Sequence, residues 1–233
     1  MIEVSVIIPT YNEKDNVKRL LPEIFSTFSK NNIRGEVIIV DDNSPDGTAE
    51  VVKKMEKRFQ VHVVKRRGKL GLSSAVLRGF KEAKGDILGV MDADFSHPVN
   101  KIPYMIKALK TNDIVIGSRY VPGGGIKNWP LKRKIVSKGA TLLAAPVTNI
   151  KDPMSGFFFL RKSVIKGVKL NPRGYKIGLE ILVKGKYEKA KEISYVFKDR
   201  AEGDSKLGID EMVDYMVHVA GLYWHLAKKE FTD

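Results

Sequence analysis

The sequence predicts an α/β fold in which helices flank a mixed, mostly parallel sheet. Short apolar runs alternate with segments of helical spacing over the first 120 residues. Three of these runs end in polar clusters, as strands do when their carboxyl ends face a ligand. With 233 residues, of which 43% are hydrophobic, the chain is long and apolar enough to bury the core that such a fold needs.

Strands and helices alternate in the first half of the chain. Apolar runs predict strands at residues 4–9, 36–40, 61–65, 86–91 and 113–117. Apolar residues at helical spacing predict helices at residues 16–30, 47–59, 72–83 and 103–109. Because each helix connects one strand to the next, we expect neighbouring strands to run parallel.

The regular alternation stops after Tyr120. The glycine triplet at 123–125 predicts a flexible break, and a later apolar run ends at Leu160. The remaining pattern predicts a basic amphipathic helix at 129–145, a short helix at 179–184, a strand at 190–197 and a long amphipathic helix at 209–228. No internal repeat or linker divides the chain, so we expect one domain over residues 1–233.

Composition narrows the class of protein. The chain has no cysteine, which excludes disulfides and thiolate chemistry. Neither a signal peptide nor a membrane-spanning run is visible, so we expect an intracellular protein. The formal charge of +14 favours a polyanionic partner, namely nucleic acid, an anionic membrane or a phosphorylated substrate. A solvated, lysine-rich surface would produce the same excess, so charge alone does not choose among them.

An acidic pair follows one of the predicted strands. The apolar run that ends at Val90 leads through Met91 to Asp92 and Asp94, which one small residue separates. Carboxylates in this place can hold a hard divalent cation, and the cation can hold a diphosphate. Oxygen ligands favour Mg²⁺ or Mn²⁺ over Zn²⁺. We therefore expect a metal site for a nucleotide-linked substrate rather than two solvated acids in a loop.

Two other predicted strands also end in polar clusters. Asp41 and Asp42 follow the second strand, where we favour contact with a ligand over a purely local role. Capping of the next helix is the main role expected of Ser44 and Asp46. Residues 9–13 follow the first strand and could wrap a nucleobase, although they could equally cap the helix that comes next.

Further side chains are candidates for chemistry or for charge balance. His97 follows the acidic pair as a possible third ligand or base, but we favour a structural role. Arg119, Arg200 and Lys206 offer cations to a phosphate. No serine–histidine–aspartate arrangement follows from the spacing, and no glycine-rich phosphate loop is present.

Taken together, these clusters resemble the family-2 glycosyltransferases of the GT-A fold, and among them the dolichyl-phosphate (polyprenyl-phosphate) mannose synthases. The matching segments run in family order at residues 6–13, 40–48, 71–75, 91–98, 116–120, 152–157 and 203–207. The resemblance implies a nucleotide-binding half over residues 1–120 and an acceptor- and membrane-facing half over residues 121–233. It extends over nearly the whole chain.

The resemblance implies an inverting transfer of mannose from GDP-mannose to dolichyl or polyprenyl phosphate, with Mg²⁺ or Mn²⁺ as cofactor. The implied residues are Pro9, Tyr11, Glu13, Asp42 and Asp92 for the nucleotide, Asp92, Asp94 and Ser96 for the metal, and Asp94, Arg119, Arg200 and Lys206 for catalysis. A lipid phosphate is already anionic and can attack without a strong base. Catalysis would then depend on positioning and on stabilisation of the departing GDP.

The chain departs from the family pattern at two positions. Ser96 stands where the family commonly has glutamine, and its shorter side chain would reach a metal only through water or a shifted loop. Glu202 places a negative charge beside the cationic stretch that ends at Lys206, so it would have to turn away from a phosphate.

Membrane contact is expected at the helix 129–145 and at the terminal helix. The implied acceptor- and membrane-contacting residues are Trp129, Arg133, Lys134, Ser137 and Lys138. Leu131, Ile135 and Leu142 would enter the lipid. The alternative is that both helices pack on the core or on a second subunit. We expect a peripheral protein on the cytoplasmic face of the membrane, with a separate membrane-anchoring subunit as one possible partner, or otherwise a cytoplasmic protein.

Two other functions remain open at this point. One is a related glycosyltransferase that uses a UDP-sugar, such as UDP-glucose, or another acceptor. The other is a non-catalytic module that binds nucleic acid or an anionic membrane. Acids at the strand ends would repel nucleic-acid phosphate, and RNA-binding aromatic signatures are absent, so no nucleic-acid partner is expected.

Overall fold

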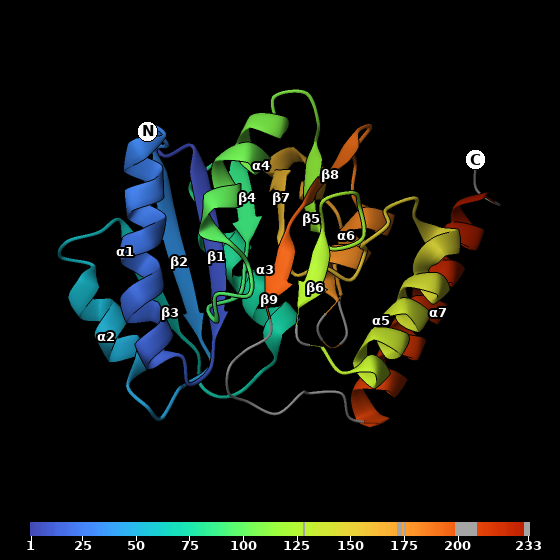
Figure 1. Ribbon diagram of the computed structural model, residues 1–233, viewed down its shortest axis with the longest axis horizontal. Helices are drawn as coiled ribbons and strands as arrows, with labels where there is room; N and C mark the ends of the chain where they lie inside the picture. Colours follow the sequence, from blue (N-terminus) through green and yellow to red (C-terminus); the bar gives the residue numbers. More distant parts are fainter. Residues whose placement is uncertain (128, 172–173, 175, 199–208, 231–233) are drawn as a thin grey trace.

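The computed structural model describes the backbone of residues 1–127, 129–171, 174, 176–198 and 209–230 (Figure 1). It also describes the side chains of these residues, apart from those at 131, 132, 134, 209–211, 229 and 230. The strands are β1 (Val4–Thr10), β2 (Gly35–Asp41), β3 (Val61–Lys65), β4 (Ile87–Val90), β5 (Ile114–Ser118), β6 (Gly125–Lys127), β7 (Phe158–Arg161), β8 (Ala190–Ser194) and β9 (Val196–Lys198). The α-helices are α1 (Lys14–Lys30), α2 (Thr48–Met55), α3 (Leu72–Glu82), α4 (Ile102–Ala108), α5 (Leu131–Ala144), α6 (Ile177–Lys184) and α7 (Ile209–Glu230).

The larger sheet confirms the predicted fold class. Its strand order is β3-β2-β1-β4-β7-β5-β8. Strands β3, β2, β1 and β4 pair in parallel, as do β5 and β8, while β7 enters between β4 and β5 in the antiparallel direction. Strand β1 is buried along nearly its whole length. Burial on both faces explains why it is a continuous apolar run rather than an alternating one.

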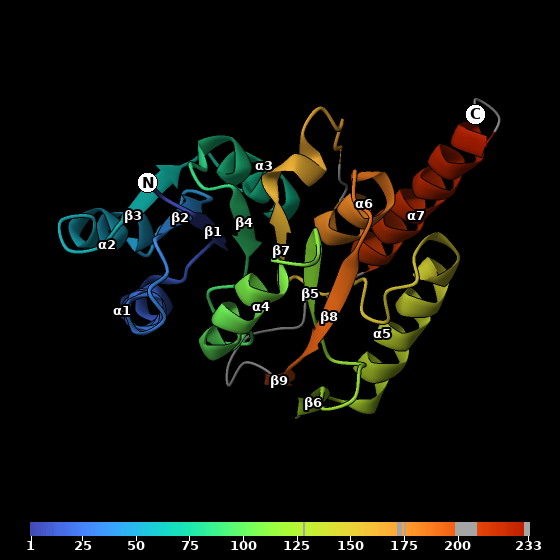
Figure 2. The ribbon, with the colours of Figure 1, turned by 90° about the horizontal axis from the view of Figure 1, so that it is seen from above.

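Helices cover both faces of this sheet (Figure 2). Helices α1, α2 and α4 pack on one face, and α3 and α6 pack on the other. Helix α1 presents a stripe of five fully or almost fully buried apolar side chains, Val17, Leu20, Leu21, Ile24 and Phe28. Burial of each such side chain stabilises the fold by about 1.5–3 kcal/mol, so this amphipathic spacing is enough to hold the helix against the sheet.

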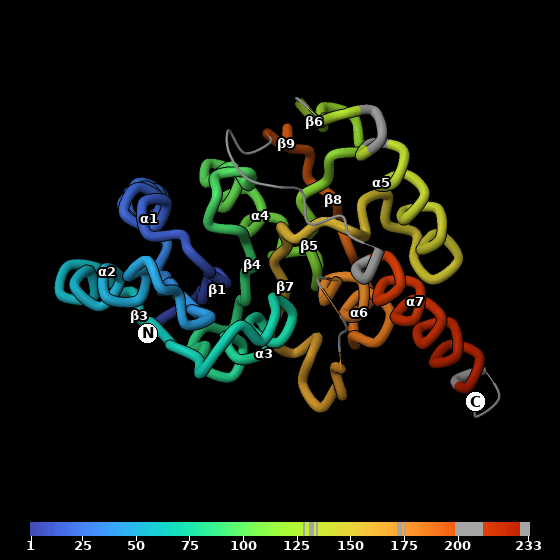
Figure 3. The backbone as a smooth tube through the Cα atoms, turned by 90° about the horizontal axis from the view of Figure 1, so that it is seen from below, coloured from blue at the N-terminus to red at the C-terminus, as the bar shows by residue number. Residues whose placement is uncertain are grey.

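Helices α5 and α7 form a separate layer beyond α6. Figures 1 and 3 show them side by side at the end of the molecule remote from α2. The hydroxyl group of Tyr223 on α7 donates a hydrogen bond of 2.9 Å to the carbonyl oxygen of Leu143 on α5. Val219 and Leu222 of α7 pack with Leu179 of α6 in a small apolar cluster. The helices predicted at 129–145, 179–184 and 209–228 are therefore confirmed as α5, α6 and α7, and one face of α7 packs on the domain.

The second half differs from the prediction in two places. The expected strand at 190–197 is two strands, because the chain leaves β8 at Tyr195 and pairs β9 with β6 in a two-stranded sheet. The backbone of Tyr195 connects the two sheets. Its N–H donates a hydrogen bond to the carbonyl oxygen of Ser118, and its carbonyl oxygen accepts one from the N–H of Gly125. Strand β6 thus lies where a flexible break was expected. The apolar run that ends at Leu160 is the antiparallel strand β7.

Among the helices in the described part of the chain, none combines the length and the apolar content needed to cross a membrane.

Candidate functional site

The polar clusters predicted at three strand ends lie at one edge of the sheet. Strand β1 pairs with β2 in a register that sets Thr10 beside Asp41. On its other side, β1 pairs with β4 so that Ile7 lies beside Val90. All three strands are parallel, so their carboxyl ends point the same way and the residues that follow them gather there. The three clusters therefore share the carboxyl edge of the sheet, which is where open sheets of this type bind ligands.

The acidic pair occupies the turn that follows β4. Phe95 has a φ of 61°, which bends the chain back so that the N–H of Ser96 donates to Oδ1 of Asp94 at 3.1 Å. The Ser96 hydroxyl is buried and, among the described residues, has no hydrogen-bond partner. The carboxylates of Asp92 and Asp94 and the hydroxyl of Ser96 form a set of oxygen ligands that fits Mg²⁺ or Mn²⁺. No group of three acidic or histidine side chains suited to a metal occurs in the part of the chain that the structure describes, so a cation here would need ligands besides these side chains.

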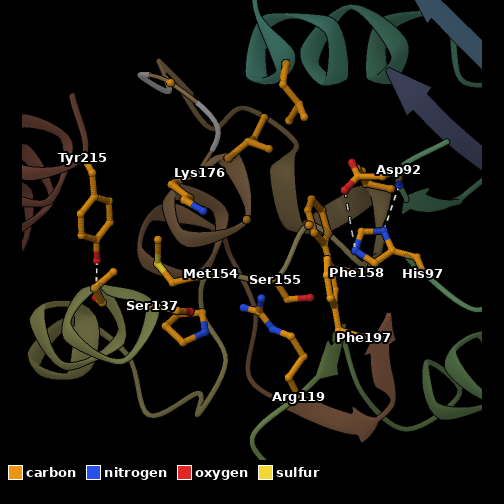
Figure 4. A pocket seen from close by; sticks show the side chains of 18 of the residues that line it. Asp92, His97, Arg119, Ser137, Met154, Ser155, Phe158, Lys176, Phe197 and Tyr215 are labelled. Carbon is orange, nitrogen blue, oxygen red and sulfur yellow. Dashed lines mark hydrogen bonds and ion pairs between the residues drawn. The ribbon is translucent and has the colours of Figure 1, made fainter. Parts of the chain in front are cut away.

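His97 holds the backbone of the acidic pair in place at Asp92. Its Nδ1 accepts a hydrogen bond of 2.9 Å from the backbone N–H of Asp92, so the proton of the neutral ring is assigned to Nε2 (Figure 4). The buried ring stacks on Phe157, with centroids 5.0 Å apart and planes 9° apart. Burial lowers the pKa of His97, and the nearby Asp92 and Asp94 carboxylates only partly oppose this. The geometry favours the structural role that the sequence suggested.

We expect His97→Ala to destabilise the fold by about 2–3 kcal/mol, because it removes a buried, stacked ring and leaves the partly buried N–H of Asp92 unpaired. Urea unfolding of the two proteins measures this difference. The variant His97→Asn keeps an acceptor near the N–H and should recover part of the loss. Equal stability of wild type and His97→Ala would contradict this role.

Arg119 is held by a partner that the sequence did not suggest. Asp152 is fully buried and accepts hydrogen bonds from the Arg119 backbone N–H, Nε and Nη2, at 2.8, 2.8 and 2.7 Å. Burial lowers the pKa of Arg119, but the hydrogen bonds and charge of Asp152 outweigh it and raise the pKa above its usual value. The guanidinium is therefore fixed and permanently charged.

A cavity of about 320 Å³ lies between the carboxyl edge of the sheet and helices α5 and α7. Of the residues predicted for the site, it brings together Asp92, Arg119, Trp129, Arg133 and Ser137. The sequence prediction did not include several others that line it, among them His97, Met154, Ser155, Lys176, Tyr195, Phe197 and Tyr215. Figure 4 shows acidic Asp92 on one side of this space and Arg119 on another.

Arg119, Arg133 and the Trp129 ring that lies against both of them form one wall of the cavity, which we call the cationic wall. The Arg133 guanidinium lies 4.2 Å from the centre of the Trp129 ring, and that of Arg119 lies 5.4 Å from it. Such contacts between a cation and an aromatic face are attractive. Ser137 also lines the cavity, and a 2.8 Å hydrogen bond between its hydroxyl group and that of Tyr120 holds it in place. Lys138 is exposed on the same helix and does not line the cavity.

The residues predicted to hold the nucleoside lie outside this cavity, after β1 and β2. The carboxylate of Asp42 is already occupied by Arg66 and by the N–H groups of Leu70 and Gly71, at 3.0 and 3.1 Å. Tyr11 is partly exposed, and the Lys69 ammonium lies 4.5 Å from its ring centre. Pro9 is the last residue but one of β1, and Glu13 accepts a 2.6 Å hydrogen bond from Asn16.

The neighbouring turn residues have local roles. Asp41 is fully buried and accepts hydrogen bonds from the hydroxyl groups of Thr10 and Ser44, so it faces the protein rather than a ligand. Ser44 accepts from the N–H of Asn12 and caps no helix, contrary to expectation. Asp46 accepts from the first backbone N–H of α1 and of α2, which confirms its predicted capping role.

Several residues with a predicted role fall outside what the structure describes. Arg200 and Lys206 lie in residues 199–208, as does Glu202, and the side chain of Lys134 is also not described.

The missed residues differ in how visible they are in sequence. Asp152 could have been found, since it begins the segment 152–157 and a buried arginine needs a partner. Lys176 and Tyr195 had no such signal. Each lies between regular elements, and neither falls in a polar cluster at the end of a predicted strand.

Comparison with known proteins agrees with this arrangement. The model of glycosyl transferase family 2 matches residues 5–168. A dolichol-phosphate mannosyltransferase of Pyrococcus furiosus is 50% identical over 223 residues, and the match covers 94% of this chain. The chain spans about 63% of the length of that relative. A dolichol-phosphate mannosyltransferase of Saccharomyces cerevisiae is 40% identical over 233 residues, which cover 95% of this chain and 87% of the yeast protein.

Solved structures share the fold at low identity. Glucosyl-3-phosphoglycerate synthase from Mycobacterium tuberculosis, in complex with Mn²⁺, UDP and glucosyl-3-phosphoglycerate, has a TM-score of 0.67 at 19% identity, covering 95% of this chain and 78% of that one. A mannosyltransferase from Pyrobaculum calidifontis in complex with GDP-mannose and Mn²⁺ has a TM-score of 0.63 at 18% identity, covering 92% and 63%. These likenesses confirm the predicted GT-A fold. The matched family model and the relatives at 40–50% identity show that the chain belongs to glycosyltransferase family 2.

Proposed function

We propose that this chain transfers mannose from GDP-mannose to the phosphate of a dolichyl or other polyprenyl lipid, with inversion at the anomeric carbon. The observation that carries the proposal is the cavity, which has Asp92 of the acidic pair at one side, the fixed Arg119 at another, and helices α5 and α7 along its rim. The curated relatives at 40–50% identity are named dolichol-phosphate mannosyltransferases, which supports the same donor and acceptor.

Residues 1–120 would bind the donor. Tyr11 and Glu13 lie where a nucleobase would reach the edge after β1, and Asp42 orders the loop beside them. Asp92 and Asp94, with the Ser96 hydroxyl nearby, would hold Mg²⁺ or Mn²⁺. When bound, this cation would neutralise the diphosphate of the donor and of the departing GDP.

The chain's own residues would then position the acceptor. Its phosphate carries the negative charge of a nucleophile, so it needs no strong base, and Arg119 and Arg133 would orient it from the cationic wall. The side chains of Trp129 and Phe197 line the same space and would exclude water from a bound acceptor phosphate. Residues 121–233 would thus form the acceptor half, with Arg200 and Lys206 as further candidates for phosphate contact.

A large exposed apolar surface supports contact with a membrane. Helices α5 and α7 leave many apolar side chains uncovered, namely Ile135, Leu142, Leu143, Met212, Val213, Met216, Val217, Tyr223 and Trp224. Exposed Lys138 lies among them on α5. Apolar side chains beside cations are typical of helices that lie in the membrane interface. We propose that the chain binds the cytoplasmic face of a membrane through this surface, alone or with an anchoring subunit.

A double charge substitution tests the membrane surface. We expect Leu142→Glu with Trp224→Glu to weaken binding to anionic phospholipid vesicles by about tenfold or more, because each charge opposes burial in lipid. These side chains are 74% and 65% exposed, so the fold should be unaffected. Vesicle sedimentation measures the binding. The matched control is Tyr104→Glu on α4, which is 64% exposed but remote from this surface. Equal weakening by the control would sink the assignment.

A donor panel tests the proposed function. The purified chain would be given polyprenyl phosphate with GDP-mannose, UDP-glucose or UDP-N-acetylglucosamine, each with and without Mn²⁺ or Mg²⁺. We expect labelled sugar to enter the lipid phase from GDP-mannose alone. A structure with the same fold was solved in complex with UDP. Transfer from a UDP-sugar alone would therefore overturn the proposal in favour of a related glycosyltransferase that uses a UDP-sugar.

A further inference from the structure

We propose that Lys176 binds a phosphate group inside the cavity, together with Arg119 and the amino end of α6. The inference deepens the proposed function and rests on it, because the phosphate would be that of the donor diphosphate or of the lipid acceptor. Both sources present the same chemistry to a lysine, and the experiment below separates them.

The first support is the position of Lys176. It directly precedes α6 and lines the cavity. Figure 4 shows its amino group and the Arg119 guanidinium pointing into the space between them. A group of phosphate size in this space would meet one cation from the start of α6 and another from the end of β5.

The second support is charge. Two hydrogen bonds from its side chain tie Arg119 to Asp152, so the charge of that arginine is largely matched within the protein. No residue in the described part of the chain forms a hydrogen bond or ion pair with the Lys176 ammonium. Burial, together with the nearby charge of Arg119, lowers the pKa of Lys176 to about 8, although the charges of Asp152 and Asp92 partly oppose this. An ammonium in these surroundings is stabilised by a bound anion.

The third support is the local backbone. The amino end of a helix carries partial positive charge, and α6 begins at Ile177 beside the lysine. Gly178, in the first turn, lines the cavity, and a Cβ there would lie only 3.3 Å from the Ser155 carbonyl oxygen and from the Phe158 ring. The close packing holds the start of the helix against the cavity wall. Much of the other wall is apolar, with Met154, Phe158 and Phe197, and charges attract more strongly in such surroundings.

Equilibrium binding to three probes tests the inference: GDP with Mn²⁺, farnesyl monophosphate and inorganic phosphate. The variants of the full chain are Lys176→Met, Lys176→Arg and the matched control Lys186→Met, which removes an exposed lysine just beyond the other end of α6. We expect Lys176→Met to weaken at least one organic probe by about tenfold or more, as for one lost charge-assisted hydrogen bond. Lys176→Arg should retain most of the affinity, and Lys186→Met should bind as wild type does.

The outcomes separate the two proposals. Weaker GDP binding assigns Lys176 to the donor diphosphate, and weaker farnesyl phosphate binding assigns it to the acceptor. Wild-type protein that binds neither organic probe overturns the proposed function, and inorganic phosphate then tests Lys176 alone. Wild-type binding of the organic probes that Lys176→Met leaves unchanged, in a variant with an unaltered thermal midpoint, overturns the assignment of Lys176. Equal loss in Lys186→Met would also overturn it, since the effect would then be one of net charge.

Discussion

Mannosyl transfer is expected to fall by about 10³-fold when Asp94 is replaced by alanine, while the free energy of unfolding stays within about 0.5 kcal/mol of wild type. Asp94 is a partly exposed carboxylate in a turn, and it accepts a hydrogen bond from the N–H of Ser96. Because the side chain is partly exposed, we expect its removal to change the stability little. Its loss would remove one of the two carboxylates from the cation site. A bound cation would stabilise the negative charge that develops on the leaving group by several kcal/mol.

Three measurements check the role of Asp94. Initial rates with GDP-mannose give the loss of activity, calorimetric titration gives the affinity for Mn²⁺, and urea unfolding gives the stability. The matched control is Asp86→Ala, an exposed acid directly before β4, at the opposite end of the same strand. The control should transfer mannose as wild type does. Near-normal turnover in Asp94→Ala would remove this residue from the proposed metal site.

The second large effect is on stability. We expect Asp152→Ala to destabilise the fold by about 3–5 kcal/mol, because it leaves the buried Arg119 guanidinium without a counter-charge. Arg119 and Asp152 are both almost completely buried, and three hydrogen bonds join them. The penalty comes from the unpaired charge more than from the loss of the pair itself. Urea unfolding of wild type and variant measures the difference.

A double-mutant cycle separates these two contributions. If the unpaired charge causes the loss, Arg119→Met combined with Asp152→Ala should be less destabilised than the sum of the single variants. Additive losses would instead indicate that the two side chains contribute independently through packing. A loss below about 1 kcal/mol in Asp152→Ala would contradict the account of a buried, fixed arginine.

The first half of the fold was predictable because its signals are local. The strand β2 was expected at 36–40 and lies at Gly35–Asp41, since a short apolar run between polar turns has few other solutions. The second half was harder. Strand β7 is antiparallel and pairs with β4 and β5, which are far from it in sequence. Tyr195 separates β8 from β9 through backbone hydrogen bonds to the end of β5 and the start of β6, and no periodicity within residues 190–197 indicates these bonds.

The candidate site divides in the same way. Asp92 and Asp94 were visible because a strand ends immediately before them. The partners of Asp42, by contrast, come from the loop after β3, so its role in ordering that loop became visible only in three dimensions. Lys176 joins the cavity because α6 packs against the sheet, and nothing in its neighbouring residues marks it as part of a site.

The most direct test of the proposed function is one measurement on the purified full chain. It follows labelled mannose from GDP-mannose into polyprenyl phosphate in the presence of Mn²⁺, and repeats the assay after a chelator has removed the metal. We predict a mannosyl phosphate lipid that forms with the metal and is lost with the chelator. No labelled lipid in either case, or equal amounts in both, would contradict the proposal of a metal-dependent polyprenyl-phosphate mannosyltransferase.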